Sequence, residues 1–224
     1  TVNTAAAIRP TAGQTLLGGG SAVTVTSNNG ISAILTLPGS RPTVHGTNAG
    51  NGVFSPALGD DVTLENMTIS GGRIGVELNN DNRVTLKNLI IQDTGDDSIR
   101  ITASDTLTID NVSVYRPNGG AEEAIQFGVL APTTQNNITI RDFYAENVNV
   151  GFLFVQGSTA NNISFENVEV KQTGNVFEIQ NGAGPDTTVN KPSGTITASN
   201  FGALCVNNDV VNNSTLTING VACP

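Results

Sequence analysis

The sequence contains no tryptophan, two tyrosines, one histidine and one methionine among its 224 residues. Charged residues make up 13% of the chain, and lysine and arginine never occur in runs. With a formal net charge of −9, the protein lacks the basic surface that nucleic acids and anionic membranes attract. No apolar run approaches the roughly 20 residues of a membrane-spanning helix. We therefore expect neither a nucleic acid partner nor a membrane span in this segment.

The chain has only two cysteines, Cys205 and Cys223, and both lie near its C-terminal end. Their closeness in sequence favours a disulfide that pins this end, with a pair of buried free thiols as the alternative. A disulfide requires an oxidising compartment, and in the chain-entropy model it contributes about 3 kcal/mol. The cysteines therefore predict a secreted or cell-surface protein that carries a Cys205–Cys223 bond.

An internal repeat organises most of the chain. Short segments recur with apolar residues at their first and third positions, a hydroxyl-bearing residue at the second and usually asparagine at the fifth. Alternation with a period of two predicts that each segment is a strand with one buried face. A second short strand follows in most units. The segments begin at Val62, Val84, Leu107, Ile138, Ile163, Ile196 and Leu216.

Units of roughly 20–25 residues are too short to enclose a core of their own, so they must bury their apolar faces by stacking. Each coil then adds one rung about 4.8 Å from the previous one. The predicted fold class is therefore all-β, a single parallel β-helix solenoid, and the crossover rule makes it right-handed. We expect residues 1–22 to form an N-terminal cap or entry segment, and residues 23–224 to form the β-helix.

Stacking places equivalent residues in columns, and three such columns support this fold. One column carries hydroxyl groups, one alternates in charge, and one carries asparagines whose amides can hydrogen-bond along the stack. The hydroxyl column contains Thr63, Thr85, Thr108, Thr139, Ser164, Thr197 and Thr217. The charged column contains Glu65, Lys87, Asp110, Arg141 and Glu166, and the asparagine column contains Asn66, Asn88, Asn111, Asp142, Asn167 and Asn200.

From about residue 60 onward, these stacked repeats resemble the right-handed parallel β-helix proteins of the pectate-lyase-like superfamily. The upstream stretches "GQTLLGGGSAVTV" and "LTLPGSRPTVHGT" resemble the entry coils of bacterial β-helix surface proteins, including autotransporter passengers. The first resemblance implies catalysis on a polysaccharide. The second implies a non-catalytic, adhesin-like or scaffold role at the cell surface.

Carboxylates gather at one turn of the expected solenoid. The register of the second strand places Asp96 beside Glu122 and Asp97 beside Glu123 in adjacent rungs, with Arg100 close by. Carboxylates this close must have raised pKa values, bind a cation, or point their side chains into the solvent. Calcium suits clustered oxygen ligands, so the sequence predicts an optional calcium site at Asp96, Asp97, Glu122 and Glu123.

A catalytic alternative depends on the stretch Gly95-Asp96-Asp97, which resembles the Gly-Asp-Asp motif that supplies catalytic carboxylates in polygalacturonase-type glycosidases. That resemblance makes Asp96 and Asp97 the catalytic candidates of a glycoside hydrolase. A polysaccharide lyase of the pectate lyase type instead needs calcium and a basic residue, roles for which the acidic cluster of Asp96, Asp97, Glu122 and Glu123, together with Arg100, offers candidates by composition alone. The chain lacks the family's Asn-Thr-Asp, Gly-His-Gly and Arg-Ile-Lys motifs, and its single histidine, His45, is expected to be structural. Our first hypothesis is therefore a non-catalytic surface module whose partner is a polysaccharide, or a glycan or protein of a host or cell surface.

Outward-facing side chains supply further binding candidates. Arg100 is predicted to lie between Glu77 and Gln126 of the adjacent rungs, where the simplest interpretation is a surface ion pair. Tyr115 and Tyr144 can stack on a sugar face, although without tryptophan they form a small platform. The predicted binding residues are therefore Glu77, Gln126, Tyr115 and Tyr144.

Overall fold

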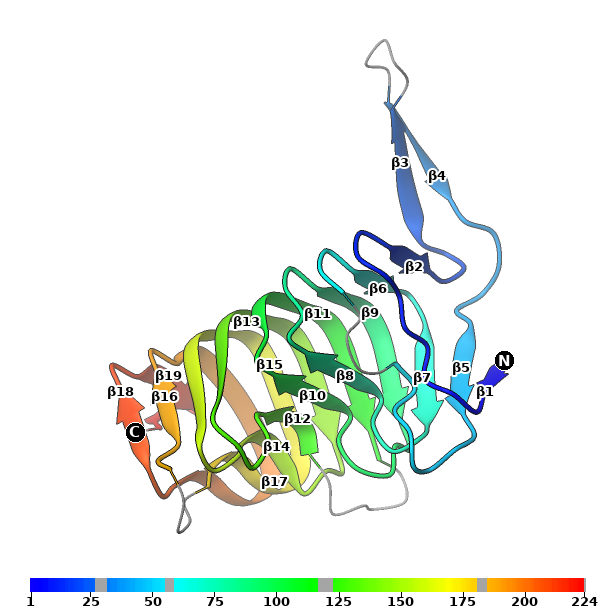
Figure 1. The fold of residues 1–224 in the computed structure, drawn as a ribbon. Helices are drawn as coiled ribbons and strands as arrows, with labels where there is room; N and C mark the ends of the chain where they lie inside the picture. Colours follow the sequence, from blue (N-terminus) through cyan, green and yellow to red (C-terminus); the bar gives the residue numbers. More distant parts are fainter. Residues whose placement is uncertain (27–31, 55–58, 117–122, 181–184, 224) are drawn as a thin grey trace.

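The computed structural model describes residues 1–26, 32–54, 59–116, 123–180 and 185–223 (Figure 1). Within these ranges the regular structure is all β, as predicted. An 18-stranded sheet winds into one solenoid, and two further strands form a separate sheet. The first ten strands are β1 (Val2–Thr4), β2 (Thr15–Leu17), β3 (Ala22–Thr26), β4 (Ser32–Thr36), β5 (Thr43–Gly46), β6 (Thr63–Glu65), β7 (Thr68–Gly71), β8 (Val76–Asn79), β9 (Thr85–Gln92) and β10 (Ile99–Thr102). The remaining strands are β11 (Asp105–Tyr115), β12 (Glu123–Phe127), β13 (Thr133–Glu146), β14 (Val150–Phe154), β15 (Ser158–Ile179), β16 (Thr188–Asn190), β17 (Ser193–Asn207), β18 (Val210–Asn212), β19 (Thr215–Ile218) and β20 (Val221–Ala222).

Successive coils pair in parallel, which confirms the predicted parallel β-helix. The solenoid has about 6 turns. Strand β11 lies between β9 and β13, and β13 lies between β11 and β15. Side chains that hydrogen-bond across neighbouring rungs are 22 to 32 residues apart in sequence. Three coils of the described ranges are longer than the predicted 20–25 residues, because chain is inserted in them: one separates Thr15 from its partner Thr63 and contains the β3–β4 hairpin, and the other two separate Asp110 from Arg141 and Asn161 from Asn190.

One-residue bends turn the chain from one face of the solenoid to the next. In one coil, Asn137, Asp142 and Asn147 have φ angles of 54°, 49° and 62°, which lie in the left-handed region. Asparagine and aspartate adopt this conformation more readily than other residues with a Cβ atom. The asparagine column of the sequence therefore marks a row of bends. The equivalent bends in the next coil are at Asn162, Asn167 and Gln172.

Apolar side chains from facing strands fill the interior. The Phe152 ring lies 5.7 Å from that of Phe143 and 4.9 Å from that of Phe165, measured between ring centroids. Phe127 and Phe154 stack at 4.5 Å in adjacent rungs. All five rings are buried. The core is thus continuous from coil to coil, as a solenoid requires.

The charged column has the predicted register. Glu65 pairs with Lys87, Lys87 with Asp110, Asp110 with Arg141, and Arg141 with Glu166. Arg141 donates a hydrogen bond of 2.8 Å to Asp110. Opposite charges therefore face one another from rung to rung, which relieves repulsion along the stack.

The last two repeats lie out of the predicted register. Ser164 pairs with Ser193, so the prediction that Thr197 continues the hydroxyl column is wrong. The ladder slips by one residue just before Val168, and Val168 pairs with Ile196. Ile196 is buried, and an apolar residue suits both the predicted position beside Ile163 and the observed position beside Val168. The alternation of apolar and polar residues therefore does not distinguish the predicted register from the observed one. Asn200 and Thr217 also lie outside their predicted columns, since Lys171 pairs with Ser199, next to Asn200, and Thr217 pairs with Thr195.

The two ends of the solenoid differ in construction. Residues 1–22, expected as a cap, supply β1 and β2, which pair in parallel with β5 and β6. The β3–β4 hairpin projects away from these first coils (Figure 1). At the other end the predicted disulfide joins Cys205 to Cys223, with a Cα–Cα distance of 5.8 Å. Within the described ranges, no helix is long and apolar enough to cross a membrane.

Candidate functional site

An acidic turn connects β9 to β10 and lies against the start of β12. It carries Asp96 and Asp97, and β12 begins with Glu123. Oxygen atoms of these three carboxylates lie within 4.8 Å of one another, so the predicted neighbourhood of Asp97 and Glu123 is present. Glu122, the fourth predicted carboxylate, lies outside the described residues. We call Asp96, Asp97 and Glu123 the carboxylate triad.

Arg100 clamps two members of the triad. Its Nη2 atom lies 2.7 Å from Oδ2 of Asp96 and 2.5 Å from Oδ2 of Asp97. The Arg100 side chain is only 12% exposed, so solvent screens these contacts weakly. Arg73 approaches the same Oδ2 atom of Asp96 at 3.9 Å from a more exposed position. Both arginine contacts of Asp96 therefore use one of its two oxygens.

Asp97 is the most enclosed member of the triad. Its side chain is 0% exposed, and its Oδ1 atom has no hydrogen-bond partner among the described residues. Burial raises the pKa of Asp97, while Arg100 and the neighbouring Glu123 oppose that rise. Two carboxylates can share a hydrogen bond only when one of them carries a proton. With both ionised, the buried Oδ1 atom of Asp97 therefore lacks a donor, which costs free energy.

Arg116 fixes the backbone of the acidic turn. Its Nη1 atom donates a 2.9 Å hydrogen bond to the carbonyl oxygen of Asp96, and its Nη2 atom donates to the carbonyl oxygen of Thr94. Arg116 is itself buried. The turn is therefore held from the following coil, independently of the side chains of the triad.

Glu77 and Gln126 occupy the predicted rungs on either side of Arg100. The guanidinium group of Arg100 bends back to the acids of its own coil. Gln126 donates a 2.9 Å hydrogen bond to the carbonyl oxygen of Gly128. The register prediction is thus confirmed, while ligand binding by Glu77 and Gln126 stays a prediction.

Tyr115 and Tyr144 lie together on a different face, where β11 and β13 run side by side. Their ring centroids are 5.5 Å apart, with the ring planes tilted by 45°. The Tyr144 hydroxyl donates a 2.7 Å hydrogen bond to Glu146, and the Lys171 ammonium lies 5.2 Å from the Tyr144 ring centroid. Burial and Glu146 raise the pKa of Tyr144 far above its usual range, so the phenol stays neutral. We call this the tyrosine face.

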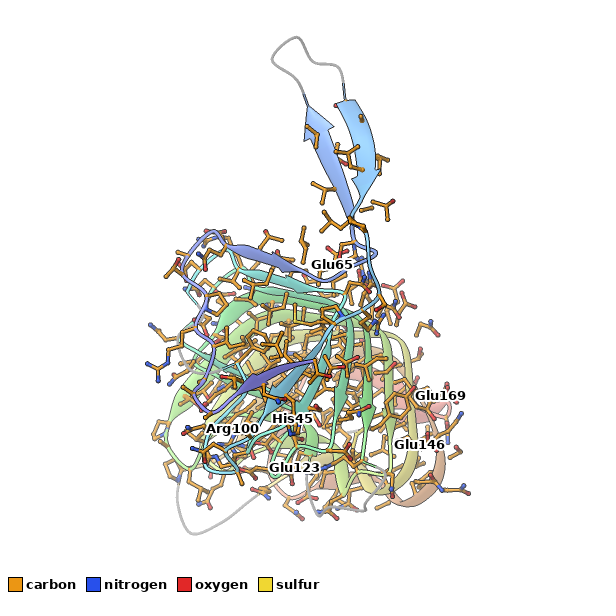
Figure 2. The ribbon with its side chains drawn as sticks, turned by 90° about the vertical axis from the view of Figure 1, so that its right-hand side faces the viewer. His45, Glu65, Arg100, Glu123, Glu146 and Glu169 are labelled. Carbon is orange, nitrogen blue, oxygen red and sulfur yellow. A yellow bond between two sulfur atoms is a disulfide. The ribbon has the colours of Figure 1, made fainter. Side chains whose placement is uncertain are left out.

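Polar hollows flank the two rings. One of about 410 Å³ is lined by Tyr115, Arg116, Glu146, Asn147 and Gln172. The other, of about 470 Å³, includes Tyr144 and the amide and carboxylate side chains of Asn111, Asp142, Asn167 and Glu169. In the end-on view of Figure 2, Glu146 and Glu169 lie on the opposite side of the solenoid from Arg100. The tyrosine face and the carboxylate triad therefore share no residue, although Arg116 lines the first hollow and also donates to the carbonyl oxygen of Asp96.

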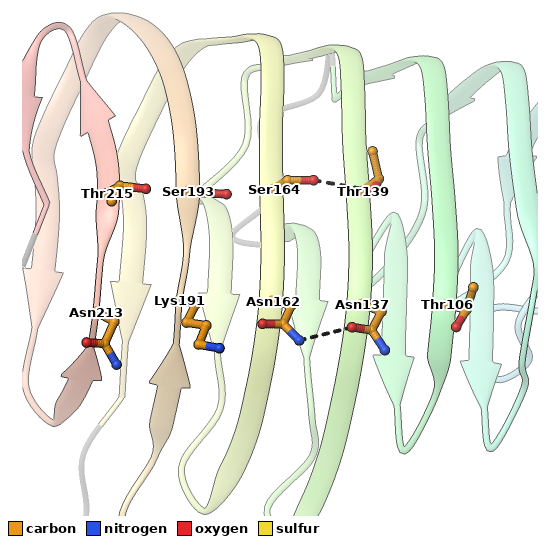
Figure 3. Close-up of a pocket in the computed structure, with 9 residues that line it drawn as sticks. All are labelled: Thr106, Asn137, Thr139, Asn162, Ser164, Lys191, Ser193, Asn213 and Thr215. Atoms are coloured by element: carbon orange, nitrogen blue, oxygen red, sulfur yellow. Dashed lines mark hydrogen bonds between the residues drawn. The ribbon is translucent and has the colours of Figure 1, made fainter.

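A third hollow, of about 730 Å³, was not anticipated from the sequence (Figure 3). It runs along the hydroxyl column and a neighbouring column of bend residues. The bend residues Asn137, Asn162, Lys191 and Asn213 have φ angles between 53° and 55°. In two repeats the bend residue, Asn137 or Asn162, directly precedes the first apolar position of the repeat. A polar residue that recurs just before the apolar segment is the sequence signal that would have indicated this column. Two hydrogen bonds link neighbours in the hollow, from Asn162 to Asn137 and from Ser164 to Thr139.

His45 lies in β5, in the first coils of the solenoid. Its Nδ1 atom lies 3.0 Å from the Ser70 hydroxyl, on the strand with which β5 pairs. This contact ties two adjacent rungs together. It is the kind of role expected for a structural histidine.

Comparisons with known proteins concern the fold. No protein-family profile and no curated protein sequence matches the chain. The catalytic domain of a GH87 α-1,3-glucanase in complex with nigerose is similar in structure, with 12% sequence identity and a TM-score of 0.40; the match covers 98% of this chain and 54% of that one. A nigerose complex of the same domain with an aspartate-to-alanine substitution gives 12% identity and a TM-score of 0.41, with the same coverage. The chain thus spans about half the length of these domains, and at this similarity the match describes the β-helix alone.

Proposed function

We propose that this chain is a non-catalytic, secreted or cell-surface β-helix module that binds a glycan on the tyrosine face. The observation that carries the proposal is the pair of adjoining rings, Tyr115 and Tyr144, placed between two polar hollows. A sugar ring has an apolar C–H face and a rim of hydroxyl groups. Tyrosine rings suit the first, and the amides and carboxylates of the hollows suit the second.

The environment of the triad argues against cleavage of a glycan by its carboxylates. A general acid or base must come within hydrogen-bond reach of the atom whose proton it moves. Asp97 is fully buried, and Arg100 holds both Asp96 and Asp97 in charge-assisted contacts. Neither hollow beside the tyrosines is lined by a residue of the triad.

The negative charge of the protein disfavours acidic glycans as ligands. The net charge is −9, and the hollows carry the carboxylates of Glu146, Asp142 and Glu169, which outnumber the cations beside them, Arg116 and Lys171. A polyuronate would be repelled by this surface, whereas a neutral glycan would not. The disulfide agrees with an extracellular setting, where such glycans are found. We therefore propose a neutral polysaccharide or a neutral cell-surface glycan as the ligand.

Replacing Tyr144 with alanine should weaken glycan binding about tenfold, because a lost stacking contact of about 1.4 kcal/mol corresponds to that ratio. The test is retention of the parent and the variant on a panel of immobilised neutral and acidic polysaccharides. Tyr144→Phe keeps the ring and should retain most of the affinity. An unchanged melting temperature in both variants shows that the fold is intact. Equal retention of parent and Tyr144→Ala, or preferential binding of acidic glycans, contradicts the proposal.

A further inference from the structure

We propose that the carboxylate triad is a calcium-binding site that joins the acidic turn to the next coil. Asp96 and Asp97 come from the turn before β10, and Glu123 comes from the start of β12. An ion held by all three bridges two consecutive rungs. None of the three triad residues lines the hollows of the tyrosine face, so this inference does not depend on glycan binding.

The charges of the triad call for a cation. Three ionised carboxylates face one largely buried guanidinium group, that of Arg100, while Arg73 lies at the rim. Counted with Arg73, three negative and two positive charges leave the triad with net negative charge. A bound cation neutralises this excess, and in a buried site that neutralisation is poorly replaced by solvent.

An unused ligand atom points to the same conclusion. The Asp97 Oδ1 atom is fully buried and has no hydrogen-bond partner among the described residues. Buried polar oxygens nearly always have a partner, so an orphan atom calls for an ion, a water molecule or a proton. The arginine contacts of Asp96 and Asp97 use their Oδ2 atoms, so Arg100 and an ion can bind different oxygens of the same carboxylates.

The spacing of the oxygens suits calcium. Ligand oxygens of the triad lie within 4.8 Å of one another. Calcium binds oxygen at about 2.3–2.6 Å, so two of its ligands can lie up to about 5 Å apart, and it accepts irregular sets of carboxylates. Magnesium binds at about 2.0–2.1 Å and requires near-octahedral geometry. Calcium is therefore the ion that we assign to the triad.

The test uses the whole chain, stripped of metal ions with a chelator and titrated with calcium chloride. Calorimetry should detect one ion bound per chain. At a hundredfold excess of calcium over its dissociation constant, the ratio of folded to unfolded protein should rise about hundredfold, with an increase in melting temperature. Asp97→Asn and, as a second variant at a less buried position, Glu123→Gln should each abolish both signals. Asp110→Asn, at an acid paired with Arg141 in the charged column, should leave them intact.

Three outcomes overturn the assignment. If calcium has no effect on the parent and Glu123→Gln is more stable than the parent, the triad holds a shared proton and no ion. If Asp110→Asn also loses the response, calcium binds at a different place. If magnesium gives the same shift at the same concentration, the site does not select calcium.

Discussion

Replacing Phe152 with alanine should destabilise the protein by about 3–5 kcal/mol, the usual cost of removing a fully buried phenylalanine ring. Phe152 lies in β14, where its ring contacts those of Phe143 and Phe165. Its exposed fraction is 0%. The substitution leaves a cavity that neighbouring rungs cannot easily fill, because each coil is held by the coils above and below it. Equilibrium unfolding in urea measures the loss.

The matched control is Leu130→Ala. Leu130 is 80% exposed, so its truncation should change stability by less than about 0.5 kcal/mol. A Phe152→Ala variant that loses less than about 1 kcal/mol would mean that the phenylalanine rings do not form a continuous core. The stacked arrangement of β12, β14 and β15 would then be wrong.

Replacing both Cys205 and Cys223 with serine should lower stability by about 3 kcal/mol, the chain-entropy value for a loop of this size. The two residues are 18 apart in sequence, and the bond connects β17 to the final segment after β20. Cys223 is buried against the last coil, so the bond also covers the end of the core. Urea unfolding should give the same free energy of unfolding for the double variant and for the parent with its disulfide reduced, and both values should be lower than that of the oxidised parent.

Mass spectrometry of the unreduced protein provides the direct check of this bond. The parent should gain the mass of two hydrogens on reduction. Equal masses before and after reduction contradict the disulfide. They also remove the argument for an oxidising, extracellular compartment.

The sequence was sufficient to predict the stack, because a solenoid repeats in one dimension. The charged column from Glu65 to Glu166 follows from the spacing of the repeats, and the structure pairs its residues in that order. The adjacency of Asp97 and Glu123 follows from the same register. The final register was not predictable, because Ile196 satisfies the apolar requirement of two different positions.

Side-chain conformations were harder to predict than positions. Arg100 was placed correctly between Glu77 and Gln126, yet its guanidinium group turns to Asp96 and Asp97. Which carboxylate a long side chain contacts depends on its rotamer, which strand alternation does not determine. The same applies to the turn itself, where Arg116 from the following coil holds the backbone and carries no recognisable signal in the sequence.

The alternation of apolar and polar residues also fails to predict burial on the outer side of the strands. Leu153 occupies an outward position between the rungs of Gln126 and Glu178, which predicts exposure. It is nevertheless buried in a small apolar cluster with Val150 and Val155. A period of two describes one strand, whereas burial depends on what lies over it.

The measurement that tests the central claim most directly is incubation of the purified chain with a polysaccharide panel, following binding and cleavage in the same samples. We predict that at least one neutral glycan is bound through the tyrosine face and recovered uncut, with no new reducing ends and no unsaturated products. Release of such products, together with their loss in an Asp96→Asn variant that keeps its fold, would contradict the account and establish the acidic turn as a catalytic site.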